Sequence, residues 1–171
     1  LFNFKASAYI KITEGCNNKC SFCAIPVIRG NLRSREVSDI LSEIKEFIKR
    51  GIYEFNLVGQ DLGVFGMTDY EDISPTPLSI LLKEISKLKG DFLIRLLYVH
   101  PDHFPLDILP IMAEDERFLP YFDIPFQSGS NLIIQKMNRK GSFDSYLSLV
   151  AKIKAAFINT KYEIPVIRTT F

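Results

Sequence analysis

Three cysteines, Cys16, Cys20 and Cys23, are the only cysteines in the chain and lie within one stretch of eight residues. A short loop closes at low entropic cost, and thiolate is the form of cysteine that binds metal ions. All three sulfurs can therefore reach one metal centre. A closed structural metal site uses four protein ligands, so three ligands indicate a coordination position that is kept open for an exchangeable ligand.

Two other interpretations of the cysteines compete with an open metal centre. The spacing C-x3-C-x2-C argues against three unrelated thiols. A zinc site is the stronger alternative, because His100 or His103 could supply a fourth ligand. Structural zinc sites usually combine a C-x2-C pair with two ligands from a distant segment, whereas here three ligands share one loop. An iron-sulfur cluster held by three thiolates fits this spacing best.

Composition and charge predict a soluble globular domain. Of the 171 residues, 47% are hydrophobic and 24% are charged, which is enough to build a buried core. The net charge of +1 gives no whole-surface field that would favour nucleic acid or an anionic membrane. No apolar run approaches the roughly 20 residues of a membrane span. No basic-then-apolar leader precedes the first predicted strand, so a cytoplasmic location is expected. The odd number of clustered cysteines fits metal or redox chemistry better than a secreted disulfide framework.

Hydrophobic spacing divides the chain into alternating strand-like and helix-like segments. Strands are predicted over residues 8–12, 54–59, 92–99, 121–124 and 162–168. Helices are predicted from a cap at Ser38 to Gly51, and over 78–88, 106–113, 132–137 and 143–157. Pro110 is expected to shorten or kink its helix. The segment from the cysteines to Glu36 is expected to be a loop.

This alternation predicts an α/β protein with a parallel sheet. A closed eight-unit barrel needs roughly 250 residues, so five strands indicate an open barrel fragment or a doubly wound sheet. In both architectures, functional residues collect where the parallel strands end. Polar, glycine-rich or cysteine-rich segments follow four of the predicted strands, at 16–23, 59–61, 100–103 and 127–130. One site at one edge of the sheet is therefore expected.

The residues around the cysteines carry a family resemblance. The pattern C-x3-C-x-aromatic-C after the first strand of a βα-barrel resembles the radical S-adenosylmethionine (SAM) superfamily. The flanking segments 14–26, 29–30 and 33–35 are similar to the methylthiotransferases of that superfamily. Further similar segments lie at 56–61, 98–103, 123–127 and 168–171. The resemblance implies that residues 1–171 form a radical SAM core domain, a partial (β/α) TIM-like barrel truncated after its fifth strand.

The resemblance also implies the cofactors. Cys16, Cys20 and Cys23 would hold a 4Fe-4S cluster whose fourth iron binds the amino and carboxylate groups of SAM. One-electron reduction of SAM would then yield a 5'-deoxyadenosyl radical that removes hydrogen from an unactivated carbon. The cofactor carries this chemistry and the protein orients it, so no catalytic residue is assigned beyond the cluster ligands.

Family position implies six contacts to SAM. An aromatic at Phe22 would lie near adenine. Many members have a Gly-Gly-Glu run that receives the methionine amino group, and this sequence has Val58-Gly59-Gln60 at that place. A glutamine carbonyl or the backbone, at Gly59 or Gln60, would then accept that hydrogen bond. Gln127 and Ser128 would meet the ribose. The guanidinium of Arg168 would pair with the methionine carboxylate in a two-pronged geometry.

Other polar side chains have both a structural and a functional interpretation. Arg95, within an apolar strand, could pair with a carboxylate where the strands end or could contact a ligand, and the same choice applies to Arg168, where function is favoured. The basic loop 29–35 is either a solvated surface or a contact for SAM or a macromolecular substrate. His100 and His103 are expected to be capping or hydrogen-bonded histidines.

Two methylthiotransferase branches differ in substrate. One thiolates the β-carbon of an aspartate in a small-subunit ribosomal protein, the S-twelve protein, and the other modifies an isopentenylated adenosine in tRNA. Segments 21–26, 60–61 and 98–102 resemble the ribosomal-protein branch, and the near-neutral charge agrees, since RNA-binding surfaces are normally basic. Segment 127–130 is closer to the tRNA branch, which stays the alternative. A non-catalytic, zinc-stabilised binding module is the second alternative.

Both branches resemble proteins of three parts. An N-terminal domain would carry its own three cysteines and a second 4Fe-4S cluster that donates sulfur, and a small C-terminal TRAM-like β-domain would grip the substrate. Because the chain begins at Leu1 and ends at Phe171, after the last predicted strand, we expect a fragment that binds a cluster and SAM but does not complete sulfur insertion. The resemblance further implies a monomer, no membrane, and an electron donor such as flavodoxin or ferredoxin.

Overall fold

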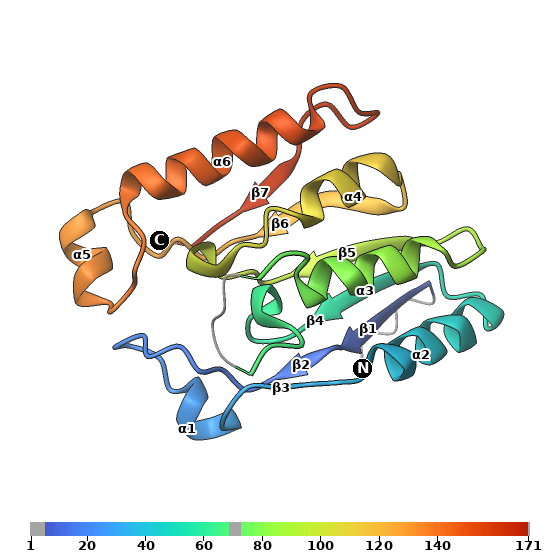
Figure 1. Cartoon of the computed structure of the whole chain (residues 1–171), viewed down its shortest axis with the longest axis horizontal. Helices are drawn as coiled ribbons and strands as arrows, with labels where there is room; N and C mark the ends of the chain where they lie inside the picture. Colours follow the sequence, from blue (N-terminus) through green and yellow to red (C-terminus); the bar gives the residue numbers. More distant parts are fainter. Residues whose placement is uncertain (1–5, 69–72, 171) are drawn as a thin grey trace.

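The computed structural model describes residues 6–68 and 73–170. Its frame is a five-stranded sheet in the order β1-β4-β5-β6-β7, in which every neighbouring pair is parallel (Figure 1). The strands are β1 (Ser7–Lys11), β4 (Glu54–Val58), β5 (Leu93–Leu97), β6 (Phe118–Asp123) and β7 (Val166–Arg168). The order never reverses along these strands, as in the wall of a barrel, whereas a doubly wound sheet reverses at a switch point. The predicted open barrel fragment is confirmed.

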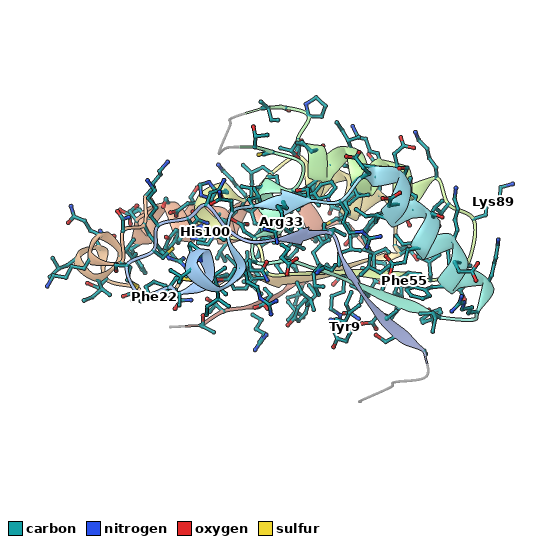
Figure 2. The ribbon with its side chains drawn as sticks, turned by 90° about the horizontal axis from the view of Figure 1, so that it is seen from below. Tyr9, Phe22, Arg33, Phe55, Lys89 and His100 are labelled. Atoms are coloured by element: carbon teal, nitrogen blue, oxygen red, sulfur yellow. The ribbon has the colours of Figure 1, made fainter. Side chains whose placement is uncertain are left out.

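The main helices cover one face of this sheet and, in the described part of the chain, leave the other face bare (Figures 1 and 2). They are α2 (Val37–Lys49), α3 (Pro77–Ser86), α4 (Ile108–Glu114) and α6 (Phe143–Phe157). The buried core lies between the helices and the sheet, and includes Ile10, Phe55, Ile94 and Phe122. Tyr9, on the bare face, is 67% exposed and points away from the helices (Figure 2). Among the described residues, no helix has the length and apolar character to cross a membrane.

Helix α2 begins before the predicted cap. It starts at Val37, so Ser38 lies inside the helix, and Glu36 takes the N-cap position without a side-chain hydrogen bond. The predicted end is correct. Gly51 adopts φ +77°, and the amides of Gly51 and Ile52 donate to carbonyls of the last helical turn. This arrangement is a Schellman motif, which favours glycine at that position.

Two other elements differ from their predicted bounds for local reasons. Helix α4 begins at Ile108, two residues later than predicted, so Pro110 lies in the first turn, where a backbone N–H has no partner within the helix. The fifth strand begins at Val166 and not at residue 162. Glu163 has φ +48°, a left-handed conformation that is incompatible with an extended strand.

The predicted loop after the first strand contains regular structure. β2 (Thr13–Glu14) pairs antiparallel with β3 (Arg33–Ser34), and α1 (Ile25–Arg29) lies between them. This pairing joins the two ends of residues 15–32, which we call the cysteine segment, and holds that segment beyond the end of β1 (Figure 1). The 3-10 helices η1 (Leu62–Val64) and η2 (Pro101–His103) follow β4 and β5, and the short helix α5 (Asn131–Lys136) follows β6.

Candidate metal centre

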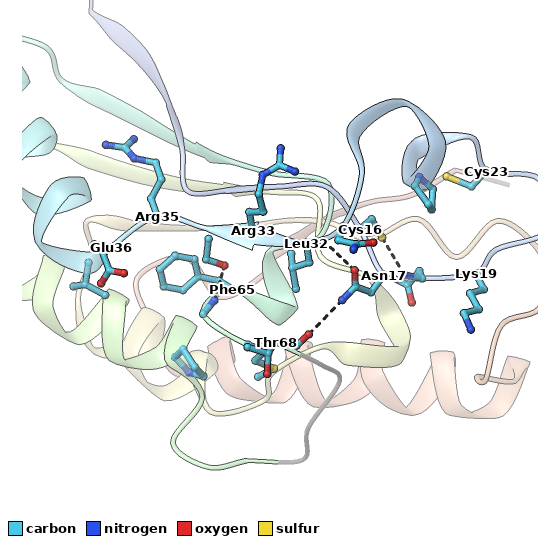
Figure 3. Close-up of a pocket in the computed structure, with 18 of the residues that line it drawn as sticks. Cys16, Asn17, Lys19, Cys23, Leu32, Arg33, Arg35, Glu36, Phe65 and Thr68 are labelled. Atoms are coloured by element: carbon cyan, nitrogen blue, oxygen red, sulfur yellow. Dashed lines mark hydrogen bonds between the residues drawn. The ribbon is translucent and has the colours of Figure 1, made fainter.

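The three cysteine side chains line one cavity of about 1040 Å³ at the edge of the sheet where the strands end (Figure 3). Cys16 is buried, Cys20 and Cys23 are partly exposed, and none of them forms a disulfide. The donor set is therefore three sulfurs around one open space, with no fourth cysteine in the chain. This set fits an iron-sulfur cluster in which one iron lacks a protein ligand.

Backbone and side-chain hydrogen bonds fix the cysteine segment. The amide of Gly15 donates to Oε1 of Gln60 at 2.7 Å, and the amide of Cys16 donates to the carbonyl of Gly30 at 3.2 Å. The side chain of Asn17 accepts from the amide of Leu32 at 3.0 Å (Figure 3). Cys16 is thus held by Gln60, which follows β4, and by residues 30–32, which precede β3.

Gly15 gives a direct test of this constraint. It has φ +78°, and a Cβ there would lie 2.7 Å from the carbonyl oxygen of Gly30. We expect Gly15→Ala to lower the free energy of unfolding by about 3 kcal/mol, from the left-handed backbone and the backbone clash together. Gly51→Ala is the matched control, because Gly51 has φ +77° with open space around it. It should cost about 1 kcal/mol in urea denaturation, and equal losses would contradict the clash.

Asp61 is the centre of a buried polar network beneath the cysteine segment. Its Oδ1 accepts from the amides of Gly63 at 3.0 Å and His100 at 3.1 Å, and its Oδ2 accepts from Nδ2 of Asn18 at 3.3 Å. Asn18 in turn accepts from Nε2 of His103 at 3.1 Å. The network ties the cysteine segment to the ends of β4 and β5. The sequence marked 59–61 as part of the site but assigned no role to Asp61.

Burial raises the pKa of Asp61 to about 7, against the lowering effect of its hydrogen bonds. The unfolded carboxyl ionises at its ordinary pKa of 3.8, so between about pH 4 and about pH 7 the unfolded state binds fewer protons than the folded state. The free energy of unfolding should therefore fall as pH rises through this window. We expect Asp61→Asn to remove that part of the pH dependence in urea denaturation of the metal-free chain. Identical pH slopes for both proteins would contradict the assignment.

The ligand atoms of Asp61, His100 and His103 lie within 4.8 Å of one another. They are already used for hydrogen bonds within the protein. Nδ1 of His100 accepts from the amide of Asp102 at 3.2 Å, and the Asp61 and His103 atoms belong to the network above. A metal ion here would have to break these bonds, so we interpret the trio as structural. The expectation that both histidines are capping or hydrogen-bonded is confirmed.

Cys20 faces two nitrogen-bearing side chains from other parts of the chain. Nε2 of His100 lies 4.0 Å from its Sγ. Because Nδ1 of His100 accepts a backbone N–H, the proton of the neutral ring is on Nε2 and points to the sulfur. Burial and the charge of Arg139 lower the pKa of His100 to about 3. Burial raises the pKa of the Cys20 thiol, and the Arg139 guanidinium opposes that rise.

Three of the predicted SAM contacts lie close to the cysteine segment. Phe22 is 52% exposed, and its ring centroid is 5.9 Å from the guanidinium carbon of Arg139. Gly59 packs against Thr13, where a Cβ would collide. The amide oxygen of Gln60 accepts from Gly15, so this residue shapes the cysteine segment whatever else it binds.

The other three lie at the ends of β6 and β7. Gln127 adopts φ +69°, and its amide donates to the carbonyl of Thr170 at 2.7 Å. Ser128 Oγ accepts from the amide of Ser130, and Arg168 pairs with Asp123 at 3.2 Å. None of the three is among the described residues that line the cysteine cavity. Their contact with SAM remains a prediction.

The remaining arginines of the sequence analysis are paired with carboxylates. Arg95 pairs with Glu54 at 3.1 Å and lies over the ring of Tyr121. The sequence predicts that Arg95 meets a carboxylate where the strands end. Glu54 is instead the first residue of β4, so the pair lies near the beginning of that strand. In the basic loop, Arg29 and Arg33 both contact Glu14, and Arg35 contacts Glu43.

Comparison with known proteins identifies this arrangement. The family model described as the radical SAM superfamily matches residues 10–170. The ribosomal protein uS12 methylthiotransferase RimO of Treponema denticola is 59% identical over the whole chain, which covers 38% of that protein. The proteins of the same name from Syntrophomonas wolfei and Dictyoglomus thermophilum are 44% and 41% identical over 90% and 95% of the chain, which covers 34% and 35% of them.

Solved structures share the fold. The radical SAM methyltransferase TsrM from Kitasatospora setae matches 89% of the chain with a TM-score of 0.67 and 16% identity, over 29% of its own length. The cobalamin-dependent SAM radical enzyme OxsB matches 94% of the chain with a TM-score of 0.68 and 11% identity, over 23% of its length. At these identities the likeness supports the partial barrel alone. The comparisons do not favour the zinc-stabilised module.

Proposed function

This chain belongs to the radical SAM superfamily, and we propose that it is the radical SAM core of a methylthiotransferase that modifies ribosomal protein uS12. The observation that carries the chemistry is the set of three cysteines around one cavity. The substrate is supported by the 59% identity to a protein named as a uS12 methylthiotransferase. The relatives are about three times longer than this chain, so the activity described belongs to the longer protein.

In this proposal, Cys16, Cys20 and Cys23 hold a 4Fe-4S cluster with one iron left for SAM. When bound, cluster and SAM supply a 5'-deoxyadenosyl radical. The work of the chain is to hold the three sulfurs in one geometry. Gln60 fixes the backbone before Cys16, and Asp61 fixes the side chain of Asn18 between the ligands. Both side chains come from the segment directly after β4, the strand that pairs with β1.

The proposed SAM contacts are Phe22, Gly59, Gln60, Gln127, Ser128 and Arg168. They come from the ends of β4, β6 and β7 and from the cysteine segment, so a ligand that reached all of them would lie across the end of the sheet. Gly59 is partly exposed although Thr13 packs against it, and its backbone carbonyl would accept the hydrogen bond from the amino group. Arg168 would exchange its partly exposed pair with Asp123 for the SAM carboxylate.

The longer protein supplies the remaining parts of the proposal. These are an N-terminal domain with a second 4Fe-4S cluster and a C-terminal TRAM-like domain. In this proposal a flavodoxin or ferredoxin serves as the electron donor, and the enzyme is a monomer. It is located in the cytoplasm, where ribosomal proteins are present. Sulfur insertion belongs to that protein and not to residues 1–171 alone.

The substrate is tested with the full-length protein that contains this chain. It is reconstituted anaerobically and incubated with SAM, a reductant, sulfide and purified uS12. We expect mass spectrometry to find one methylthio group in place of one hydrogen on an aspartate of uS12, and none with the Cys20→Ala variant. Modification of isopentenylated tRNA with unmodified uS12 would contradict the proposed substrate.

A further inference from the structure

Arg139 is a buried arginine without a counter-ion. Its residue is 7% exposed, and its Nε has no hydrogen-bond partner among the described residues. Nη1 donates to the carbonyl of Pro125 at 2.6 Å, which satisfies one N–H but brings no negative charge. Within the described part of the chain Arg139 forms no ion pair, whereas every other arginine does.

Such a charge is costly to bury. An unpaired guanidinium in a protein interior loses several kcal/mol of solvation, and proteins normally offset this loss with a carboxylate or a bound anion. The nearby carboxylates are engaged elsewhere. Asp61 accepts three hydrogen bonds from other groups, and Asp102 accepts from the amides of Lys140 and Gly141 and from the hydroxyl of Tyr146. The partner of Arg139 is therefore expected to be a group that binds at the site.

Contacts between the two segments place Arg139 in the same cavity as Cys20. The end of α5 and the residues after it dock on the cysteine segment. Asn138 donates to the carbonyl of Lys19 at 2.7 Å, and the hydroxyl and amide of Ser21 donate to the carbonyls of Lys136 and Met137. Arg139 and Cys20 line one cavity of about 310 Å³, together with His100. The guanidinium also lies over the ring of Phe22, two residues beyond Cys20.

We propose that Arg139 is the buried counter-charge of the metal centre at Cys20 and that it favours the reduced state of the cluster. This inference rests on the proposed cluster assignment. Three thiolates outweigh the positive charge of an oxidised 4Fe-4S core, and reduction adds one more negative charge. A fixed cation beside one thiolate stabilises the reduced form more than the oxidised form, so it raises the reduction potential. Arg139 is not a ligand in this proposal: its positive charge acts on the cluster through the Cys20 thiolate.

The test compares reduction potentials in the chain itself, which has three cysteines and so holds one cluster. Wild type, Arg139→Gln, Arg139→Lys and Arg50→Gln are reconstituted anaerobically, and the midpoint potential is measured by redox titration followed by EPR. Arg50→Gln is the control, because it removes the same charge from an exposed pair with Glu46 at the far end of α2. Iron content and circular dichroism confirm that the variants are loaded and folded.

We expect Arg139→Gln to make reduction about tenfold less favourable, a shift of about 59 mV to more negative potential for one electron. Arg139→Lys should fall between wild type and Arg139→Gln, and Arg50→Gln should match wild type. A loaded Arg139→Gln variant with the wild-type potential overturns the inference and leaves the cluster assignment intact. A wild-type chain that binds no iron overturns both.

The outcome stays decisive if Arg139→Gln takes up no iron. In that case a loaded Arg139→Lys variant supports a requirement for charge, because lysine keeps the cation and loses the planar guanidinium. If Arg139→Lys is folded but also takes up no iron, the packing of the guanidinium against Pro125 and Phe22 is what matters. That result overturns the electrostatic role.

Discussion

Cys20→Ala should reduce the iron content of the reconstituted chain from about four atoms to background, with loss of the visible thiolate-to-iron absorption. The chain has no fourth cysteine that could replace the missing ligand, and two thiolates do not hold a 4Fe-4S cluster. Cys16→Ala and Cys23→Ala should behave alike. Iron and acid-labile sulfide analysis after anaerobic reconstitution measures the effect.

Ser21→Ala is the control for this experiment. It changes the neighbouring residue and removes one hydrogen bond to the carbonyl of Lys136, but no ligand. It should keep its iron. A Cys20→Ala chain that still binds about four irons would show that the three sulfurs are not the ligands. A wild-type chain that instead takes up one zinc, with no visible absorption, would support the binding module.

Asp61→Ala should lower the free energy of unfolding of the metal-free chain by about 3 to 5 kcal/mol. The carboxylate is fully buried and accepts three hydrogen bonds, so its removal leaves the donors of Gly63, His100 and Asn18 without their acceptor. Each unsatisfied buried donor costs about 1 to 3 kcal/mol, and water that enters the new space recovers a part. Urea denaturation measures the change.

Asp91→Ala provides the matched comparison, because Asp91 is an exposed aspartate. It should change the free energy of unfolding by no more than about 0.5 kcal/mol. If Asp61→Ala were as mild as Asp91→Ala, the buried network would not stabilise the fold. Asp61→Ala should also bind iron less completely, because Asn18, between Cys16 and Cys20, loses its hydrogen bond to the Asp61 carboxylate.

The ligands and the type of fold could be predicted because their signals are local in the sequence. Cys16, Cys20 and Cys23 are close in the chain, and the period of apolar residues marks each strand and helix. Errors arose where one residue decides the local geometry. Serine is a common N-cap residue, but α2 starts one residue before Ser38. Proline disrupts a helix only beyond the first turn, and Pro110 lies within the first turn of α4.

The residues that support the site could not be found in this way. Asp61 and Arg139 are distant from the cysteines in the chain, and only the folded sheet brings the end of β4 and the segment after α5 to the cysteine segment. Arg139 lies in no segment that the sequence analysis identified, and Asp61 lies in one without a role of its own. One signal was present: segment 59–61 follows a predicted strand, and polar residues at that edge of a parallel sheet gather around a site.

The most direct test of the account is the response of the reduced cluster to SAM. The three-thiolate site leaves one iron for the amino and carboxylate groups of SAM, so adding SAM to the reconstituted, dithionite-reduced chain should change the EPR spectrum of the cluster. About four irons per chain and a SAM-dependent spectrum are the predicted result. A fully loaded cluster whose spectrum is the same with and without SAM would contradict the open coordination position on which the account depends.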